Sequence, residues 1–143
     1  MNIVKRAAAI AAIACAVPLA GAVAPSTAKA ATFPTQCKYP VATYARPGNF
    51  FTVYHETLNA EVCFNGQSVW APWTNHRFSA VPGWNGTELG RGTFYDPNRY
   101  GGSLTVWSND RDSVGFGPVT FNEDTFLRIW VTRTGQVYTY AGR

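Results

Sequence analysis

The chain has 143 residues, 15% of them aromatic, with 12 basic and 8 acidic side chains. Three of the basic residues, Lys5, Arg6 and Lys29, belong to a predicted export signal, which leaves nine basic against eight acidic residues in the predicted mature chain. This balance excludes a nucleic-acid binder that relies on phosphate neutralisation, and the aromatic content excludes a disordered chain. No run of about 18 apolar residues follows the signal, so stable membrane insertion is not expected.

The first 30 residues have the features of an export signal. Two basic residues precede an apolar run at 7–17, and the Ala-Lys-Ala at 28–30 matches the small-x-small pattern that signal peptidase cleaves. We therefore predict a signal peptide at 1–30 that is removed from a secreted, extracellular single domain at 31–143. A retained membrane anchor, or lipidation at Cys15, is the alternative.

Two cysteines, Cys37 and Cys63, remain after removal of the signal. An even number of cysteines in an exported chain predicts one disulfide, because nothing outside the cytoplasm keeps thiols reduced. On the loop-entropy model such a bridge stabilises the fold by about 3.5 kcal/mol. A catalytic or metal-binding thiol is not expected, since neither a third ligand nor a base accompanies the pair.

In chain order, residues 32–40 form an extended leader, and residues 50–54, rich in aromatic and β-branched side chains, predict the first strand. Asn65-Gly66 predicts a two-residue hairpin turn between strands at 61–64 and 67–70, with positive φ at both turn positions. Asn85-Gly86 repeats this turn signal, and the proline- and glycine-containing segment 70–84 predicts a long loop. Residues 103–107 alternate as in a strand.

The last hairpin has the clearest pattern: residues 126–132 return through Thr134-Gly135 into residues 136–141. A two-residue loop pairs Val131 with Tyr138 and Ile129 with Tyr140, which predicts that these tyrosines share the core face with Leu127, Ile129 and Val131. Arg128 and Trp130 fall on the other face. No segment has helical periodicity, so the chain is predicted to be an all-β antiparallel sandwich or barrel.

Tyr95, Tyr100 and Gly102 have the spacing of an aromatic residue, four residues, a second aromatic, one residue and a glycine. This pattern resembles the signature of a βγ-crystallin Greek key, which implies positive φ at Gly102 and a Greek-key unit over 91–141, with Tyr95 near Tyr100. The segment Leu127-Arg128-Ile129 is similar to the strand that closes such a motif. The serine that precedes this strand in the family is replaced by Thr125 or Phe126.

The first half is similar to small exported bacterial βγ-crystallin-like proteins of the killer-toxin-like branch, through Asn49–Tyr54 and Cys63-Phe64-Asn65-Gly66. The resemblance implies a βγ-crystallin-like Greek-key sandwich of short antiparallel strands with one disulfide. It also implies an antimicrobial or cytotoxic effector. A secreted peptidase inhibitor is the alternative, because some bacterial inhibitors share this architecture.

βγ-crystallin motifs often carry a calcium loop, and two segments resemble one here. The first begins with Asn109 and Asp110, and the second extends from Asn122 to Thr125. Both lack the closing serine, so neither a metal site nor a cofactor is expected, although a weak calcium site at either place is left open.

Catalytic residues are not expected. The two histidines are His55 and His76, no nucleophile elbow is present, and His55 and Glu56 point to opposite faces of a predicted strand. A small cell-wall hydrolase is therefore the less favoured alternative.

The candidate binding residues are Trp70, Trp73, Arg77 and Trp84. Loop tryptophans offer a large rigid surface with a polar N–H and could anchor a carbohydrate or a protein, or they could be the core of a small domain. We expect a monomeric, secreted, non-enzymatic binding protein whose partner is a protein or another cell-surface target.

Overall fold

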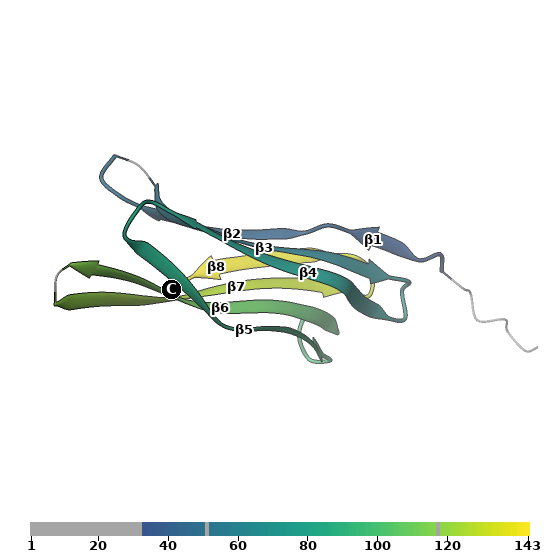
Figure 1. Ribbon diagram of the computed structural model, residues 1–143. Coiled ribbons are helices and arrows are strands. Elements are labelled where there is room, and N and C mark those ends of the chain that lie inside the picture. Colours follow the sequence, from purple (N-terminus) through teal and green to yellow (C-terminus); the bar gives the residue numbers. More distant parts are fainter. Residues whose placement is uncertain (1–32, 51, 117) are drawn as a thin grey trace, which may run out of the picture. The chain divides into compact units, whose positions relative to one another are not determined.

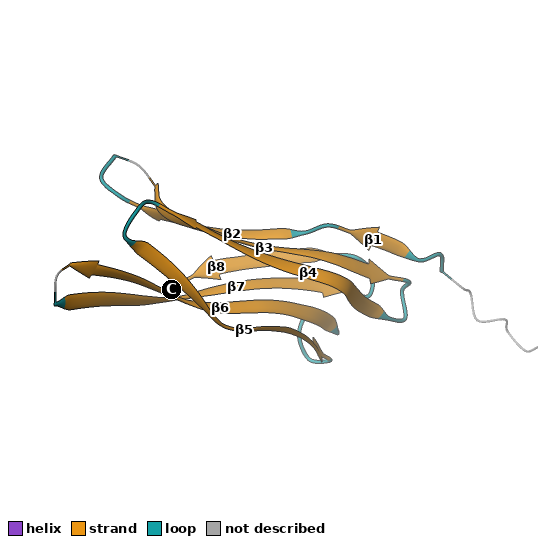
Figure 2. Cartoon of the chain, viewed as in Figure 1, coloured by secondary structure: helices purple, strands orange, loops and turns teal. Residues whose placement is uncertain are grey.

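The computed structural model describes residues 33–50, 52–116 and 118–143, and the predicted signal peptide lies outside them. The described residues form β-strands joined by turns, without a helix, as Figure 2 shows. The strands are β1 (Gln36–Lys38), β2 (Val41–Pro47), β3 (Thr52–Phe64), β4 (Val69–Ala80), β5 (Trp84–Asp96), β6 (Ser103–Phe116), β7 (Val119–Thr132) and β8 (Val137–Gly142). Among the described residues, no helix is long and apolar enough to cross a membrane.

Two antiparallel sheets contain all of these strands (Figure 1). In the first sheet, β3 pairs with β4 on one side and with β1 and β2, one after the other, on its other side. In the second sheet the order is β5-β6-β7-β8. The all-β antiparallel prediction is thus confirmed, but residues 91–141 form a meander, whereas a Greek key would return its fourth strand beside its first.

The predicted loop at 70–84 is wrong, because β4 occupies most of it. β4 pairs only with β3 in the described structure, so it is an edge strand, and an edge strand tolerates Pro72 because one side of its backbone needs no partner. The turn that follows lies at Gly83, with φ of +95°, and the Trp84 N–H donates to the Val81 carbonyl. The predicted turn residues Asn85 and Gly86 lie inside β5 instead.

The first hairpin forms where the sequence predicts it, but its turn differs in detail. Gly66 has φ of +81°, whereas Asn65 has negative φ. The Asn65 side-chain oxygen accepts hydrogen bonds from the N–H groups of Gln67 and Ser68, at 3.1 and 2.8 Å. Asn65 therefore stabilises the turn through its side chain rather than by adopting a left-handed backbone.

The last hairpin has a three-residue loop, 133–135, rather than the predicted two-residue loop. The Thr132 N–H donates to the Gln136 carbonyl at 3.0 Å, and Gly135 occupies the loop's left-handed position with φ of +81°. Three-residue loops that end in a left-handed glycine are a common hairpin type. The extra residue shifts the register of β8 by one.

This shift moves Tyr138 and Tyr140 to the outer face of the second sheet. Trp130 pairs with Tyr138, and Arg128 pairs with Tyr140, so the prediction that these tyrosines lie in the core is wrong. A slip of one residue reverses the face of every side chain in a strand. The β7 residues predicted for the core, in contrast, are fully buried: Leu127, Ile129 and Val131.

The interior between the sheets is apolar at one end and polar further along, beyond which Tyr54 and Val114 are again buried. The apolar end contains ten buried side chains from both sheets: Ala42, Leu58, Ala60, Val62, Phe64, Leu104, Val106, Leu127, Ile129 and Val131. Further along the same strands, the inward positions hold buried polar side chains: Glu56 on β3, Ser108, Asp110 and Asp112 on β6, and Thr125 on β7. Burial of so many polar groups in a small domain requires a specific chemical reason.

Candidate functional site

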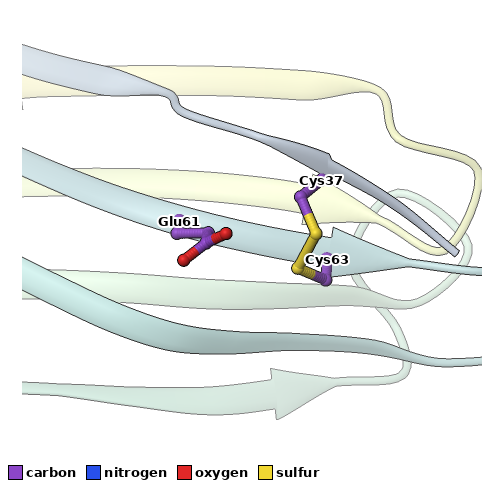
Figure 3. A group of neighbouring side chains, drawn as sticks. All are labelled: Cys37, Glu61 and Cys63. Carbon is purple, nitrogen blue, oxygen red and sulfur yellow. A yellow bond between two sulfur atoms is a disulfide. The ribbon is translucent and has the colours of Figure 1, made fainter.

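The predicted disulfide between Cys37 and Cys63 is confirmed and joins β1 to β3. Figure 3 shows Glu61 on β3 beside this bridge. The Glu61 carboxylate and the two sulfur atoms lie close enough to hold a metal ion. Both sulfurs are consumed by the disulfide, however, and only a thiolate is a good ligand, so this trio is a cross-link and not a metal site.

Three of the four predicted binding residues lie on the outer face of the first sheet. Trp70, Trp73 and Arg77 are exposed along β4, while Val69 and Ala71 face the core. The register of the β3–β4 ladder shifts between Glu61 and Cys63, which lets the two tryptophans share one face although they are three residues apart. Trp73 is 50% exposed and Trp70 39% exposed.

Polar side chains from β3, β4 and the connection between β1 and β2 surround Trp73. In the ladders, Trp73 stands opposite Glu61, and Asn75 stands opposite Asn59. The Tyr39 hydroxyl donates to Glu61 Oε1 at 3.0 Å, and the carboxylate raises the pKa of Tyr39 through this hydrogen bond and its charge. We call the surface formed by Tyr39, Asn59, Trp70, Trp73, Asn75 and Arg77 the outer aromatic face.

A shallow groove of about 270 Å³ runs across the outer aromatic face, lined by Tyr39, Asn59, Trp73, Asn75 and Arg77, among others. Its lining combines two exposed aromatic rings with two neutral amides and one guanidinium. This arrangement can hold a ligand that is flat and apolar on one side and rich in hydroxyl groups at its edge.

Trp84 does not belong to this surface. Its ring packs against Tyr54, with 5.2 Å between ring centroids, and the Arg46 guanidinium lies 4.8 Å from the Trp84 ring centroid. Arg46 also pairs with Glu123 on β7. Trp84 therefore joins the ends of the two sheets, and the structure does not bring it together with Trp70 and Trp73.

The two segments that resemble calcium loops are strands. Asn109 and Asp110 lie in β6, and Asn122 and Thr125 lie in β7. The Asn109 side-chain oxygen accepts a hydrogen bond from Arg128 at 2.7 Å, so it is already occupied. Because side chains alternate along a strand, neighbouring residues cannot converge on one ion as they do in a calcium loop.

The same alternation that separates neighbouring residues of the two calcium-loop-like segments brings a different set of polar side chains together inside the protein. Glu56, His76, Asp110, Asp112 and Thr125 meet between the sheets and are called the interior polar cluster below. Thr125 Oγ1 lies 2.7 Å from Glu56 Oε2 and 3.0 Å from Asp112 Oδ2, and it can donate its single proton to only one of them at a time. His76 Nε2 lies 3.3 Å from Asp110 Oδ2.

The surroundings of the interior polar cluster disfavour negative charge. Burial raises the pKa of Glu56 to about 8; the hydrogen bond from Thr125 opposes this rise and the neighbouring Asp112 adds to it. Burial also raises the pKa of Asp110, against a hydrogen bond from Ser108 and the attraction of His76. Three carboxyl groups thus share a region with the imidazole of His76.

Sequence reasoning missed this cluster, although a signal for it exists. Ser108, Asp110 and Asp112 continue the same alternating face as Val106, which lies in the core. Following that alternation past Val106 would have placed both aspartates inside the protein.

Comparisons with models of protein families, with curated proteins and with solved structures find no match to this chain.

Proposed function

We propose that the protein is a secreted, non-enzymatic binding protein whose outer aromatic face holds a polysaccharide chain at a cell surface. The observation that carries the proposal is the exposure of Trp70 and Trp73 on one sheet face, beside the amides of Asn59 and Asn75. Large exposed apolar side chains promote aggregation in a soluble protein unless a partner uses them.

The chemistry of the groove favours a carbohydrate over a protein partner. A pyranose ring has an apolar face that packs on an indole, and hydroxyl groups at its edge that pair with amide side chains. Asn59 and Asn75 stand opposite one another and can each donate and accept hydrogen bonds. The groove on this face is shallow and open, whereas protein hot spots form in well-packed pockets.

Sedimentation with insoluble polysaccharides tests the proposal, using a panel of β-glucan, chitin and bacterial cell walls. Wild-type protein is expected to pellet with at least one of them, and Trp73→Ala is expected to bind at least about tenfold more weakly. Phe94→Ala is the matched control, because Phe94 is 52% exposed on the second sheet, away from the outer aromatic face. Equal losses in both variants, or no binding to any polymer, would refute the proposal.

The same variants test the antimicrobial and peptidase-inhibitor hypotheses. What supports the βγ-crystallin resemblance behind them is the positive φ of Gly102, at +102°, whereas the meander order of β5–β8 speaks against it. If the protein inhibits bacterial growth or a peptidase, Trp73→Ala is expected to remove that activity with little change in melting temperature. An activity that survives in Trp73→Ala would place the functional surface elsewhere.

A further inference from the structure

We propose that Glu56, His76 and Asp110 form an interior binding site for a divalent first-row transition metal of the Zn²⁺ or Mn²⁺ class. Each of these residues offers one ligand atom, and the three atoms lie within 4.8 Å of one another. Ligands bound to one ion at about 2.1 Å are at most about 4.2 Å apart, so a small closure of the side chains would bring all three into bonding distance.

The unpartnered atoms of the cluster point to a missing ligand. Glu56 Oε1, His76 Nε2 and Asp112 Oδ1 are buried and form no hydrogen bond of acceptable geometry, although His76 Nε2 lies 3.3 Å from Asp110 Oδ2. Glu56 and Asp112 are fully buried, and the His76 side chain is 7% exposed. A buried polar atom without a partner is costly. Glu56 and His76, which contribute two of these atoms, belong to the group whose ligand atoms lie within 4.8 Å of one another.

Charge leads to the same conclusion. Within the described part of the chain, no lysine or arginine forms an ion pair with Glu56, Asp110 or Asp112. The arginines near the cluster are engaged elsewhere: Arg111 pairs with Asp124, and Arg46 with Glu123. A divalent cation would neutralise two of the three buried carboxylates at the place where they meet.

Nδ1 of His76, the nitrogen that does not face the cluster, lies near a carboxylate, as the outer histidine nitrogen does in many metal sites. His76 Nδ1 lies 3.6 Å from Glu88 Oε2, while Nε2 points into the cluster. This distance is that of an ion-pair contact and exceeds a hydrogen bond, so Glu88 would have to move closer to fix the imidazole tautomer and strengthen Nε2 as a ligand. Thr125 has the corresponding role for the carboxylates, because its hydroxyl lies between Glu56 and Asp112. Glu88 and Thr125 are therefore positioning residues.

The position of His76 also provides a route for the ion. His76 lies on β4 and Glu88 on β5, which are the edge strands of the two sheets in the described structure. Glu88 is 39% exposed, so the group reaches solvent at the seam between these edges. The imidazole ligand selects the metal class: nitrogen with carboxylate oxygen suits Zn²⁺ or Mn²⁺, whereas Ca²⁺ and Mg²⁺ prefer oxygen alone.

The direct test is titration of chelator-treated, untagged protein with ZnCl₂, MnCl₂ and CaCl₂ by calorimetry. We expect one Zn²⁺ or Mn²⁺ per chain and a rise in melting temperature of at least about 5 °C at a hundredfold excess over the dissociation constant. His76→Ala and Glu56→Gln are expected to weaken binding at least about 100-fold, and Glu88→Gln about tenfold. His55→Ala is the matched control, since His55 precedes Glu56 on β3 but is exposed on the opposite face.

A measurement on the wild-type protein keeps the proposal testable even if the variants do not fold. The sequence has two histidines, so their imidazole signals can be followed by NMR during a Zn²⁺ titration, with His55→Ala providing the assignment. The His76 signal is expected to shift at one equivalent while the His55 signal stays in place. Absence of stoichiometric Zn²⁺ or Mn²⁺ binding, a shift at His55 alone, or a preference for Ca²⁺ would overturn the proposal.

Discussion

Replacement of Gly102 by alanine tests the backbone conformation that the sequence predicts and the structure contains. Gly102 has φ of +102°, beyond the narrow left-handed region that alanine can enter, and such conformations cost an alanine about 1–3 kcal/mol. A methyl group at this position would also collide with the Tyr95 hydroxyl and lie 2.8 Å from Arg133 Nη2. Both neighbours are ends of flexible side chains and can move, so the backbone contributes most of the cost.

The adjacent Gly101 is the matched control. It has φ of +72°, close to the ordinary left-handed region, and nothing lies within 4 Å of the position that its Cβ would take. We expect Gly101→Ala to lower the free energy of unfolding by about 1 kcal/mol and Gly102→Ala by about 2–3 kcal/mol. For a domain of this size each kcal/mol lowers the melting temperature by roughly 4–8 °C, a difference that thermal melts and urea titrations resolve.

Tyr95→Phe separates the steric cost of the new methyl group from the cost of the backbone conformation. In the Gly102→Ala background it removes the oxygen that collides with the new methyl group, so it is expected to recover the steric part of the loss and leave the backbone part. If Gly102→Ala destabilises the protein no more than Gly101→Ala does, then neither the larger φ nor the contact with Tyr95 has the assigned effect.

Two further predictions concern the disulfide and the one predicted binding residue that lies elsewhere. The double variant Cys37→Ser/Cys63→Ser is expected to lower the free energy of unfolding by about 2–5 kcal/mol, because the 26-residue separation is no longer constrained in the unfolded chain; an unchanged urea midpoint would contradict this. Trp84→Ala is expected to destabilise the fold by about 3 kcal/mol, because the packing of its ring on Tyr54 is lost. The folded variant is expected to bind polysaccharide as the wild type does, and sedimentation at a temperature well below its melting temperature checks this.

The sequence predicts features of the fold that depend on local chemistry. The disulfide follows from the number of cysteines in an exported chain, and positive φ at Gly102 is what the resemblance of Tyr95, Tyr100 and Gly102 to the βγ-crystallin signature implies. The buried face of β7 follows from alternation at Leu127 and Val131. None of these features requires knowledge of which strands are neighbours in the sheets.

Features that depend on neighbouring strands are not predictable in the same way. Thr134-Gly135 is compatible with a loop of two or three residues, and that single residue decides whether Tyr138 faces the core or solvent. Pro72 suggests a loop because a central strand excludes proline, but β4 is an edge strand, and its edge position is a property of the whole sheet.

In the candidate site, too, local features are predictable from the sequence and features set by neighbouring strands are not. Residue type alone selects Trp70, Trp73 and Arg77 as candidate binding residues, but the strand that aligns them on one face is not predicted, because the segment has the composition of a loop. Asp110 is expected in a surface segment that resembles a calcium loop, because charged residues are rarely buried, and this average misleads at a site where several charged groups gather.

The two proposed sites share no ligand-contacting residue because they use opposite faces of one strand. Trp73 and His76 both belong to β4, but Trp73 faces solvent while the His76 side chain lies between the sheets. In metal-free protein, substitution of His76 is therefore expected to leave polysaccharide binding unchanged. β4 is nevertheless held on one side only, so an ion that ties His76 to Glu56 and Asp110 would also fix the strand that carries Trp73. If metal binding strengthens polysaccharide binding, linkage requires that the polysaccharide strengthen metal binding by the same factor, and β4 is the element through which that coupling would act.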